Sequence, residues 1–318
     1  MCSTRSRDEE IYEFFDNIEE YIKKAKTAES PSVFTKAEKG CNAFMNSSGS
    51  YFKDEDTAKG ICVQYIKLYD SLSDLTSTSR IETNYKKCRK FLNYWVNFKF
   101  RENMKNEDYS VCNVYDFIES QFTANTDFNV HIGLIDNINK DDLYKMNILY
   151  RLYKIYTDLD DIVDNATNHV KKKLSSLSSA CCTDYLVANY MCNGGNGDNI
   201  NPSQFCMQLQ KFKKKYEGLY VRVNRNGVEY SNNFIQLTQC NNNTVSTALI
   251  GTTVGLVPLL VGLYKFTPLR QLMNFKKGKL TQEYRNNEDE MRNIMLMDQG
   301  SEHISSQQGT YNIKYHSV

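Results

Sequence analysis

The sequence predicts a mainly α-helical protein, with a disulfide-linked helical bundle ectodomain followed by a single carboxyl-terminal transmembrane helix and a disordered tail. Proline is rare, with 4 among 318 residues, whereas there are 22 tyrosines and 16 phenylalanines. This composition favours long helices with aromatic packing over a turn-rich β protein. Several segments also repeat apolar residues at helical spacing. One uncharged apolar stretch differs from the rest of a chain whose mean hydropathy is -0.57.

Amphipathic helices are predicted at residues 8–26, 57–72, 142–163 and 201–220. Ser6 and Glu9 form a capping box before the first of them, and Asn201 is the expected N-cap of the last, with Pro202 at its first helical position. The third helix has the widest apolar stripe, made of Leu143, Met146, Leu149, Tyr150, Tyr153, Tyr156, Leu159 and Val163. Each apolar face needs a partner, so we expect these helices to pack into one bundle.

The predicted connections between these helices are polar. Residues 27–50 are rich in serine and lysine, and the sequence NGGNGDNINP at 193–202 is typical of a loop. The run LYVRVN at 219–224 is a candidate strand. The resulting organisation is a helical ectodomain at 1–220, a juxtamembrane segment at 221–243, a transmembrane helix at 244–264 and a cytosolic tail at 265–318.

All ten cysteines precede the apolar stretch and none follows it. This distribution is expected if the two sides of a membrane differ in redox state. The candidate disulfide cysteines are Cys41, Cys62, Cys88, Cys112, Cys181, Cys182, Cys192, Cys206 and Cys240, with Cys2 as a tenth. The adjacent Cys181 and Cys182 should have different partners, because a bridge between neighbours is strained. No Cys-x-x-Cys pair is present, so we expect no zinc centre and no cofactor.

The apolar stretch STALIGTTVGLVPLLVGLYKF, at residues 246–266, is either the core helix of a soluble domain or a membrane span. The 20 residues 245–264 carry no charge and, as a helix, reach about 30 Å, the thickness of a bilayer's hydrocarbon core. A buried globular helix is usually shorter and has a polar stripe. This segment is apolar all round, so the sequence favours a span in a lipid bilayer.

The residues around the span predict its orientation. The basic residues Lys265, Arg270, Lys276, Lys277 and Lys279 follow it before the first acid, Glu283. Basic residues stay on the cytosolic side, so the carboxyl terminus is expected inside and the amino terminus outside. The first ten residues contain no apolar segment, so no cleaved secretory signal is expected. Gly251, Gly255 and Gly262 form a candidate face for homodimerisation, although small residues are common in spans anyway.

One motif suggests an enzyme. Asp160, Asp161 and Asp164 in DDIVD match the DDxxD pattern with which helical isoprenoid enzymes hold Mg²⁺ and a diphosphate. Such enzymes need a second acidic cluster on an opposing helix, and the next one, NEDE at 287–290, lies beyond the predicted span. The sequence therefore favours a solvated acidic face over a catalytic site. The net charge of +1 likewise argues against a nucleic-acid partner.

Four segments resemble a known family. They are KKCRKFLNYWVNFKF at 86–100, LYKMNILYRLYKIY at 143–156, FCMQLQKFKKKYEGLY at 205–220 and LYKFTPLRQL at 263–272. Together they resemble the Plasmodium interspersed repeat (PIR) superfamily, particularly its vivax-type, VIR-like variant antigens. The resemblance extends over residues 10–280.

The resemblance implies a variant surface antigen of a blood-stage malaria parasite, not an enzyme. Such a protein would be displayed on the infected host cell or the parasite and serve in antigenic variation and immune evasion, with host receptors or antibodies as partners. The alternative is an internal membrane-anchored scaffold protein with reduced cysteines. The sequence names neither the receptor, the membrane nor the export route.

Overall fold

A computed structural model describes residues 11–32, 34–76, 80–106, 109–125, 133–165, 171–193 and 203–240. The chain divides into two units, Met1–Val257 and Pro258–Val318, and the described residues all belong to the first. The predicted span at 244–264 and tail at 265–318 lie outside the described residues. Within the described part, no helix combines the length and the apolar character needed to cross a membrane.

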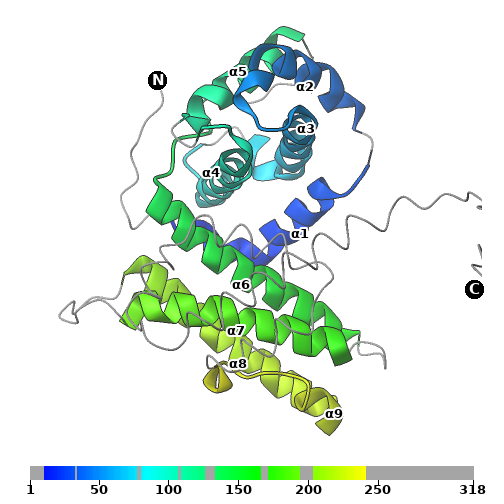
Figure 1. The fold of residues 1–318 in the computed structure, drawn as a ribbon, viewed down its shortest axis with the longest axis vertical. Coiled ribbons are helices and arrows are strands. Elements are labelled where there is room, and N and C mark those ends of the chain that lie inside the picture. Colours follow the sequence, from blue (N-terminus) through cyan, green and yellow to red (C-terminus); the bar gives the residue numbers. More distant parts are fainter. Residues whose placement is uncertain are drawn as a thin grey trace, which may run out of the picture. The chain divides into compact units, whose positions relative to one another are not determined.

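The described residues are mainly helical, which confirms this part of the predicted fold class (Figure 1). The α-helices are α1 (Ile18–Glu29), α2 (Thr35–Ser48), α3 (Glu55–Ser71), α4 (Thr83–Asn103), α5 (Val111–Asn125), α6 (Lys140–Asp164), α7 (Lys171–Asn193), α8 (Gln204–Arg225) and α9 (Val228–Ser231). The short 3-10 helices are η1 (Glu13–Asn17), η2 (Gly49–Tyr51), η3 (Ser73–Thr76) and η4 (Leu237–Gln239). The only β-type pairing in these ranges is a single bridge between Phe52 and Met104.

Side-chain caps fix where several helices begin. Asp54 accepts the Thr57 amide at the start of α3, and Asn139 accepts the Asp142 amide at the start of α6. Helix α8 begins at Gln204, because the hydroxyl of Ser203 accepts the amide of Cys206. The prediction of an N-cap at residue 201 is therefore displaced by two residues.

Two local predictions are wrong. The candidate strand at 219–224 is the last part of α8, because Leu219 and Val223 continue the buried stripe of that helix. The polar connection at 27–50 contains α2, whose Ala37, Cys41 and Phe44 are buried. In both places long-range packing outweighs the local composition.

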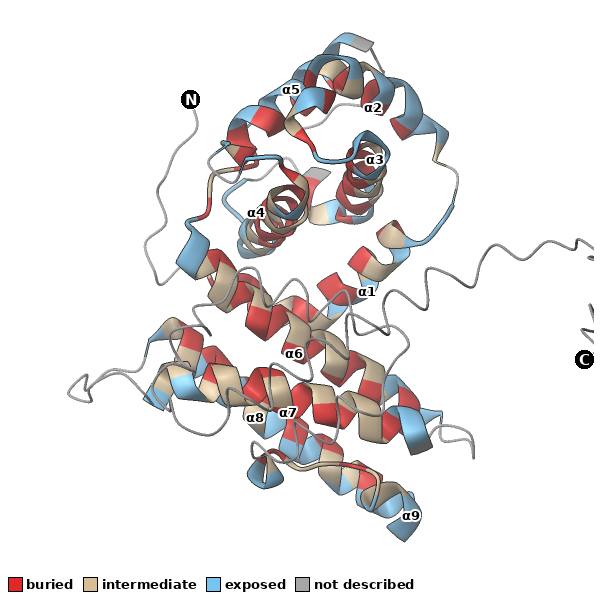
Figure 2. Ribbon diagram, viewed as in Figure 1, coloured by how far each residue is buried: buried red, intermediate tan, exposed pale blue. Residues whose placement is uncertain are grey.

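The helices pack in two groups, with α1 between them (Figure 1). In the first group, α2 packs on α3 and α5, and α3 packs on α4. In the second group, α6 packs on both α7 and α8. Helix α1 contacts α3 on one side and α6 on the other. The buried residues of all these helices form one continuous core (Figure 2).

The segment before α1 joins the two groups through adjacent aromatic rings. Phe14 stacks on Tyr94 of α4 at 5.4 Å between ring centroids, whereas Phe15 packs on Tyr153 of α6 at 6.0 Å. The two phenylalanine rings also stack on each other at 4.4 Å. Neither ring is more than 2% exposed. We call Phe14 and Phe15 the aromatic wedge, because they fill the space between α4 and α6.

Ion pairs surround the aromatic wedge and reach the same two groups. Asp16 lies 3.4 Å from Lys87 of α4 and 2.9 Å from Lys211 of α8. Glu13 lies 2.7 Å from Lys90 of α4. Burial raises the pKa of Asp16, but the two lysines outweigh this effect, so its pKa is below the ordinary value. These pairs are largely solvated, so each adds little stability beside the aromatic packing.

After α8 the chain turns back and packs on its own domain. Gly227 has a φ of 112°, a conformation that other residues rarely adopt, and it separates α8 from α9. Residues 234–240, which we call the return segment, then lie against α7 and α8. The Tyr216 hydroxyl donates to the carbonyl of Ile235 at 2.9 Å, and the Ile235 amide donates to Ser178 at 3.1 Å.

The predicted boundary between ectodomain and juxtamembrane segment lies at residues 220 and 221. That boundary falls inside α8, whose bounds are Gln204–Arg225. The buried Phe234 packs on the Tyr216 ring at 5.0 Å, and Cys240 is bonded to Cys182 of α7. The folded domain therefore continues to Cys240.

The aromatic wedge yields a test of how the two groups are held together. We expect Phe15→Ala to lower the free energy of unfolding by about 3 to 5 kcal/mol, because it leaves a cavity between α6 and η1. Urea unfolding followed by the fluorescence of Trp95, the only tryptophan and itself buried, measures this change. The matched control is Ile81→Ala, at a side chain that is 82% exposed. Equal effects of the two substitutions would contradict the role of the wedge.

Candidate functional site

Disulfides cross-link both helix groups, as the sequence predicted. Three lie wholly in the described residues: Cys41–Cys62 joins α2 to α3, Cys192–Cys206 joins the end of α7 to the start of α8, and Cys182–Cys240 joins α7 to the return segment. Cys112 on α5 is also disulfide-bonded. A bridge with the sequence separation of 21 found for Cys41–Cys62 typically adds about 3 kcal/mol by restricting the unfolded chain.

Two of the predicted bridge cysteines are instead free thiols. Cys88 is buried on α4, where its sulfur lies 3.5 Å from the Tyr21 hydroxyl and 3.6 Å from a carboxylate oxygen of Asp74. Cys181 is buried in the core beside the bridged Cys182. Adjacent residues on a helix point about 100° apart, so only one of these two cysteines faces the return segment.

The environment of both free thiols makes them unreactive. Burial raises the pKa of Cys88 to about 11, and it raises the pKa of Cys181 well above its ordinary value. A thiol acts as a nucleophile only after it loses its proton. Neither Cys88 nor Cys181 is therefore suited to covalent catalysis at neutral pH.

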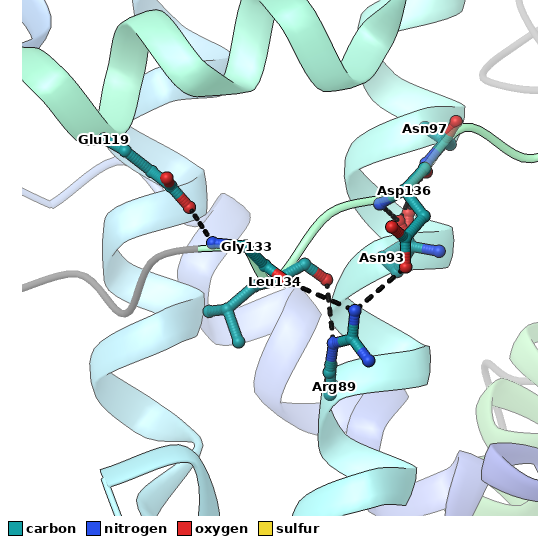
Figure 3. A network of polar contacts seen from close by, with 7 residues as sticks. All are labelled: Arg89, Asn93, Asn97, Glu119, Gly133, Leu134 and Asp136. Carbon is teal, nitrogen blue, oxygen red and sulfur yellow. Dashed lines mark hydrogen bonds and ion pairs between the residues drawn. The ribbon is translucent and has the colours of Figure 1, made fainter. Parts of the chain in front are cut away.

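A polar network on α4 holds the chain that leads into α6 (Figure 3). The guanidinium group of Arg89 donates to the carbonyls of Gly133 and Leu134 at 3.2 and 3.3 Å, and to the carboxylate of Asp136 at 2.9 Å. Arginine suits this role because its planar fork offers several donors at once. One side chain thus fixes both ends of the segment 133–136.

Two asparagines extend this network along the same face of α4. Asn93 accepts the Asp136 amide at 2.9 Å, and the side-chain amide of Asn97 donates to the Asp136 carbonyl at 2.8 Å. The buried Asn97 also accepts the Ile138 amide at 3.1 Å. Arg89, Asn93 and Asn97 are four residues apart, a spacing that aligns them on one helix face. Sequence reasoning missed this stripe, although the spacing itself was visible within 86–100.

Gly133, the first residue of the segment, is also held by α5. Glu119, only 7% exposed, accepts the Gly133 amide at 2.8 Å (Figure 3). Burial raises the pKa of Glu119 above its ordinary value, and the hydrogen bond from Gly133 only partly offsets that effect. Segment 133–138 is therefore held between α4 and α5 by polar contacts to its backbone.

A buried ion pair joins α6 to α7. Arg151 donates from Nε and Nη2 to the two carboxylate oxygens of Asp184, at 2.9 and 2.6 Å. Both side chains are mostly buried. Such a pair fixes the relative register of two helices, because loss of either partner leaves an uncompensated buried charge.

The acidic motif DDIVD lies at the end of α6 and is neutralised by the protein itself. Arg222 of α8 forms ion pairs with both Asp160 and Asp164, whereas Asp161 is exposed. Two of the three carboxylates of the motif are thus already paired with a guanidinium group. Within the described ranges no three His, Cys, Asp or Glu side chains are grouped to hold a metal ion.

The exposed residues of the described part, pale blue in Figure 2, are mostly polar in the sequence. The exposed large hydrophobic side chains are Ile81, Tyr109, Phe117, Tyr190, Met207, Val221 and Val228. Three of them, Met207, Val221 and Val228, belong to α8 and α9. The predicted flanking residues Lys265, Arg270, Lys276, Lys277 and Lys279 and the dimer face Gly251, Gly255 and Gly262 lie outside the described residues.

Comparison with known families matches residues 226–318 to the model described as Plasmodium vivax Vir protein. Residues 226–318 are therefore similar to the Vir family. The match begins at Asn226, directly after α8, and its described part is 226–240, which contains α9 and the return segment. Vir proteins are a variant antigen family. No curated protein and no solved structure matches the chain.

The cysteine pairing is directly testable. In urea without reductant, we expect iodoacetamide to modify Cys88 and Cys181, whereas the six cysteines of the three described bridges stay unmodified in disulfide-linked peptides. In the native protein Cys88 and Cys181 should also resist modification, because both are buried and protonated. Peptide mass spectrometry locates the labels. A label on Cys182 or Cys240 in unreduced protein would contradict the pairing.

Glu119 gives a pH-dependent prediction. Its pKa is raised above 4.5 in the folded protein. Between pH 4.5 and the raised pKa, Glu119 is therefore mostly deprotonated in the unfolded state but still protonated in the folded state. Unfolding becomes easier as the pH rises through this range. We expect Glu119→Gln to lack this loss of stability, because glutamine can still accept the Gly133 amide and carries no charge.

Urea unfolding at a series of pH values tests the Glu119 prediction. The wild-type and Glu119→Gln profiles should converge in acid and separate towards neutral pH, with the variant more stable there. Glu38→Gln, at an exposed position on α2, controls for the loss of one acidic side chain. Parallel profiles for wild type and Glu119→Gln at every pH would disprove the assignment.

Proposed function

We propose that this protein is a Vir-family variant surface antigen of the blood-stage parasite, held in a membrane by one span at 244–264. In this proposal the helical domain lies outside and the tail at 265–318 is cytosolic. The observation that carries it is the bridge between Cys182 and Cys240. It closes the folded domain three residues, 241–243, before the proposed span, so the domain and the proposed anchor directly follow one another.

The distribution of thiols and disulfides supports an oxidising environment. Bridges occur in both helix groups, and the free thiols are buried where oxidants do not reach them. Disulfides persist in exported and surface proteins and are rare in reducing compartments. This argues against the alternative of an internal membrane-anchored scaffold protein, whose cysteines would be reduced.

The fold suits a variable antigen because the contacts that hold it together lie mostly in its interior. The aromatic wedge, the bridges and the polar network on α4 all hold buried groups, whereas the exposed helix faces are free to change. Exchange of exposed residues on such a scaffold would alter host-receptor binding and antibody recognition without unfolding it. Neither role needs catalysis, and the pairing of Arg222 with Asp160 and Asp164 argues against the isoprenoid enzyme.

Protease treatment of intact infected cells tests this proposal. We expect trypsin to degrade the helical domain from outside and to leave a membrane-protected fragment that contains the span and residues 265–318. A tag at the carboxyl terminus detects this fragment on a gel, and permeabilised cells, in which the tag is lost, are the control. Full protection of the chain in intact cells would support the internal scaffold.

Carbonate extraction tests the anchor independently. The full chain should stay with the membrane pellet at alkaline pH, because a helix of about 20 apolar residues is held by the hydrocarbon core itself. Release of the full chain into the supernatant would refute the span and the surface arrangement built on it.

A further inference from the structure

Helix α7 defines the face of the domain on which Cys240, the last described residue, lies. Asp184 of α7 points to α6, where it pairs with Arg151. Cys182 lies two residues earlier, and at about 100° per residue its side chain points to the opposite side of the helix. The bridge from Cys182 therefore holds Cys240 on the side of α7 that faces away from α6.

Helix α6 lies between this face and the first helix group. It contacts α1 and α4 on one side and α7 and α8 on the other (Figure 1). The return segment is thus on the far side of the domain from the group formed by α2, α3, α4 and α5.

The chain between Cys240 and the proposed span is short, which limits the distance between this face of the domain and the membrane. Three residues, 241–243, separate Cys240 from the proposed span and reach at most about 14 Å when fully extended.

The outward surface of α8 has a composition that suits contact with lipid headgroups. Met207, Gln210, Lys214, Val221 and Arg225 are all exposed and lie on one side of the helix, opposite its buried stripe. This outer stripe mixes apolar with basic side chains, a combination typical of helices that lie at a membrane interface.

The charge of the outer stripe is available to a ligand. Lys214 and Arg225 have no ion-pair partner among the described residues. The single acid of α8, Glu217, lies 4.0 Å from Lys213. Val228, at the start of α9, continues the apolar part of the surface and is 73% exposed. Unpaired cations can contact the phosphate groups that phospholipid headgroups carry, and the exposed aliphatic side chains beside them can face the acyl boundary.

We propose that the outer stripe of α8, together with Val228, rests on the lipid headgroups, so that the group of α2 to α5 is the part of the domain farthest from the membrane. This inference rests on the proposed span and adds the orientation of the domain to it. It assigns the membrane-distal surface, where receptors and antibodies have access, to the Cys41–Cys62 half of the fold.

Site-specific fluorescence in vesicles tests this orientation. Full-length protein with Val221→Cys or Ile81→Cys carries an NBD label on the new thiol, since Cys88 and Cys181 are buried. Val221 and Ile81 are 52% and 82% exposed, so either position accepts a label without disturbing the core. The vesicles contain phosphatidylcholine and phosphatidylserine, with a nitroxide on a fraction of the headgroups as the quencher.

We expect quenching to be several-fold stronger at position 221 than at 81, because an interfacial helix lies within about 10 Å of the headgroup boundary. Adding Lys214→Glu and Arg225→Glu should weaken quenching at 221 in these vesicles and in vesicles of phosphatidylcholine alone, because both present headgroup phosphates that the basic side chains contact. Equal quenching at both positions, or stronger quenching at 81, would overturn the orientation even if the chain resists carbonate. Release by carbonate would instead overturn the proposed function.

Discussion

The packing of Phe14 and Phe15 is the contact on which the arrangement of the domain depends. These adjacent rings insert between α4 and α6, the helices at which the two groups face each other. Aromatic side chains suit this position because each buries a large apolar area, and stacked or tilted ring contacts add further stabilising free energy. The ion pairs of Glu13 and Asp16 surround the rings and favour the same arrangement of α4 and α8 around them. These pairs are too solvated to stabilise that arrangement without the aromatic packing.

The remaining constraints act within each group and differ in kind. Disulfides connect helices that are already neighbours, and they restrict the unfolded chain more than they shape the folded one. The polar network on α4 instead specifies geometry, because Arg89, Asn93 and Asn97 recognise backbone groups of 133–138 one by one. Buried polar groups of this kind are costly when unpaired, so they allow few alternative placements. The segment leading into α6 is thereby fixed without a helix or strand of its own.

These internal constraints are what make the proposed role physically reasonable. A surface antigen must change its exposed residues while it keeps one fold. Here the groups that determine the fold are buried or partly buried: the wedge, the bridges, the Arg151–Asp184 pair and the network on α4. The exposed faces of α2 and α5 contribute little to stability, because surface substitutions away from such features usually change it only slightly. The return segment adds a further constraint, because the Cys182–Cys240 bridge fixes the last described residue against α7.

Part of this structure follows from the sequence alone. The apolar stripes at helical spacing predicted the helical fold, and that of 142–163 corresponds closely to α6, because a long amphipathic pattern has only one low-energy arrangement. The abundance of cysteines predicted disulfides. The acidic motif at the end of α6 was interpreted as a solvated acidic face, and its partner Arg222, which pairs with Asp160 and Asp164, was not foreseen.

Tertiary contacts decided the rest, because they join residues that are distant in the sequence. Nothing local distinguishes Cys181 from Cys182, and only the position of the return segment selects Cys182 for the bridge. The run at 219–224 has strand-like composition but stays helical, since Leu219 and Val223 pack in the core beneath α8. The predicted helix at 8–26 includes the 3-10 turn η1, because its two adjacent phenylalanines contact different helices. Periodicity determined which segments are helical, whereas the burial of particular side chains against distant partners determined where each helix ends and which cysteines meet.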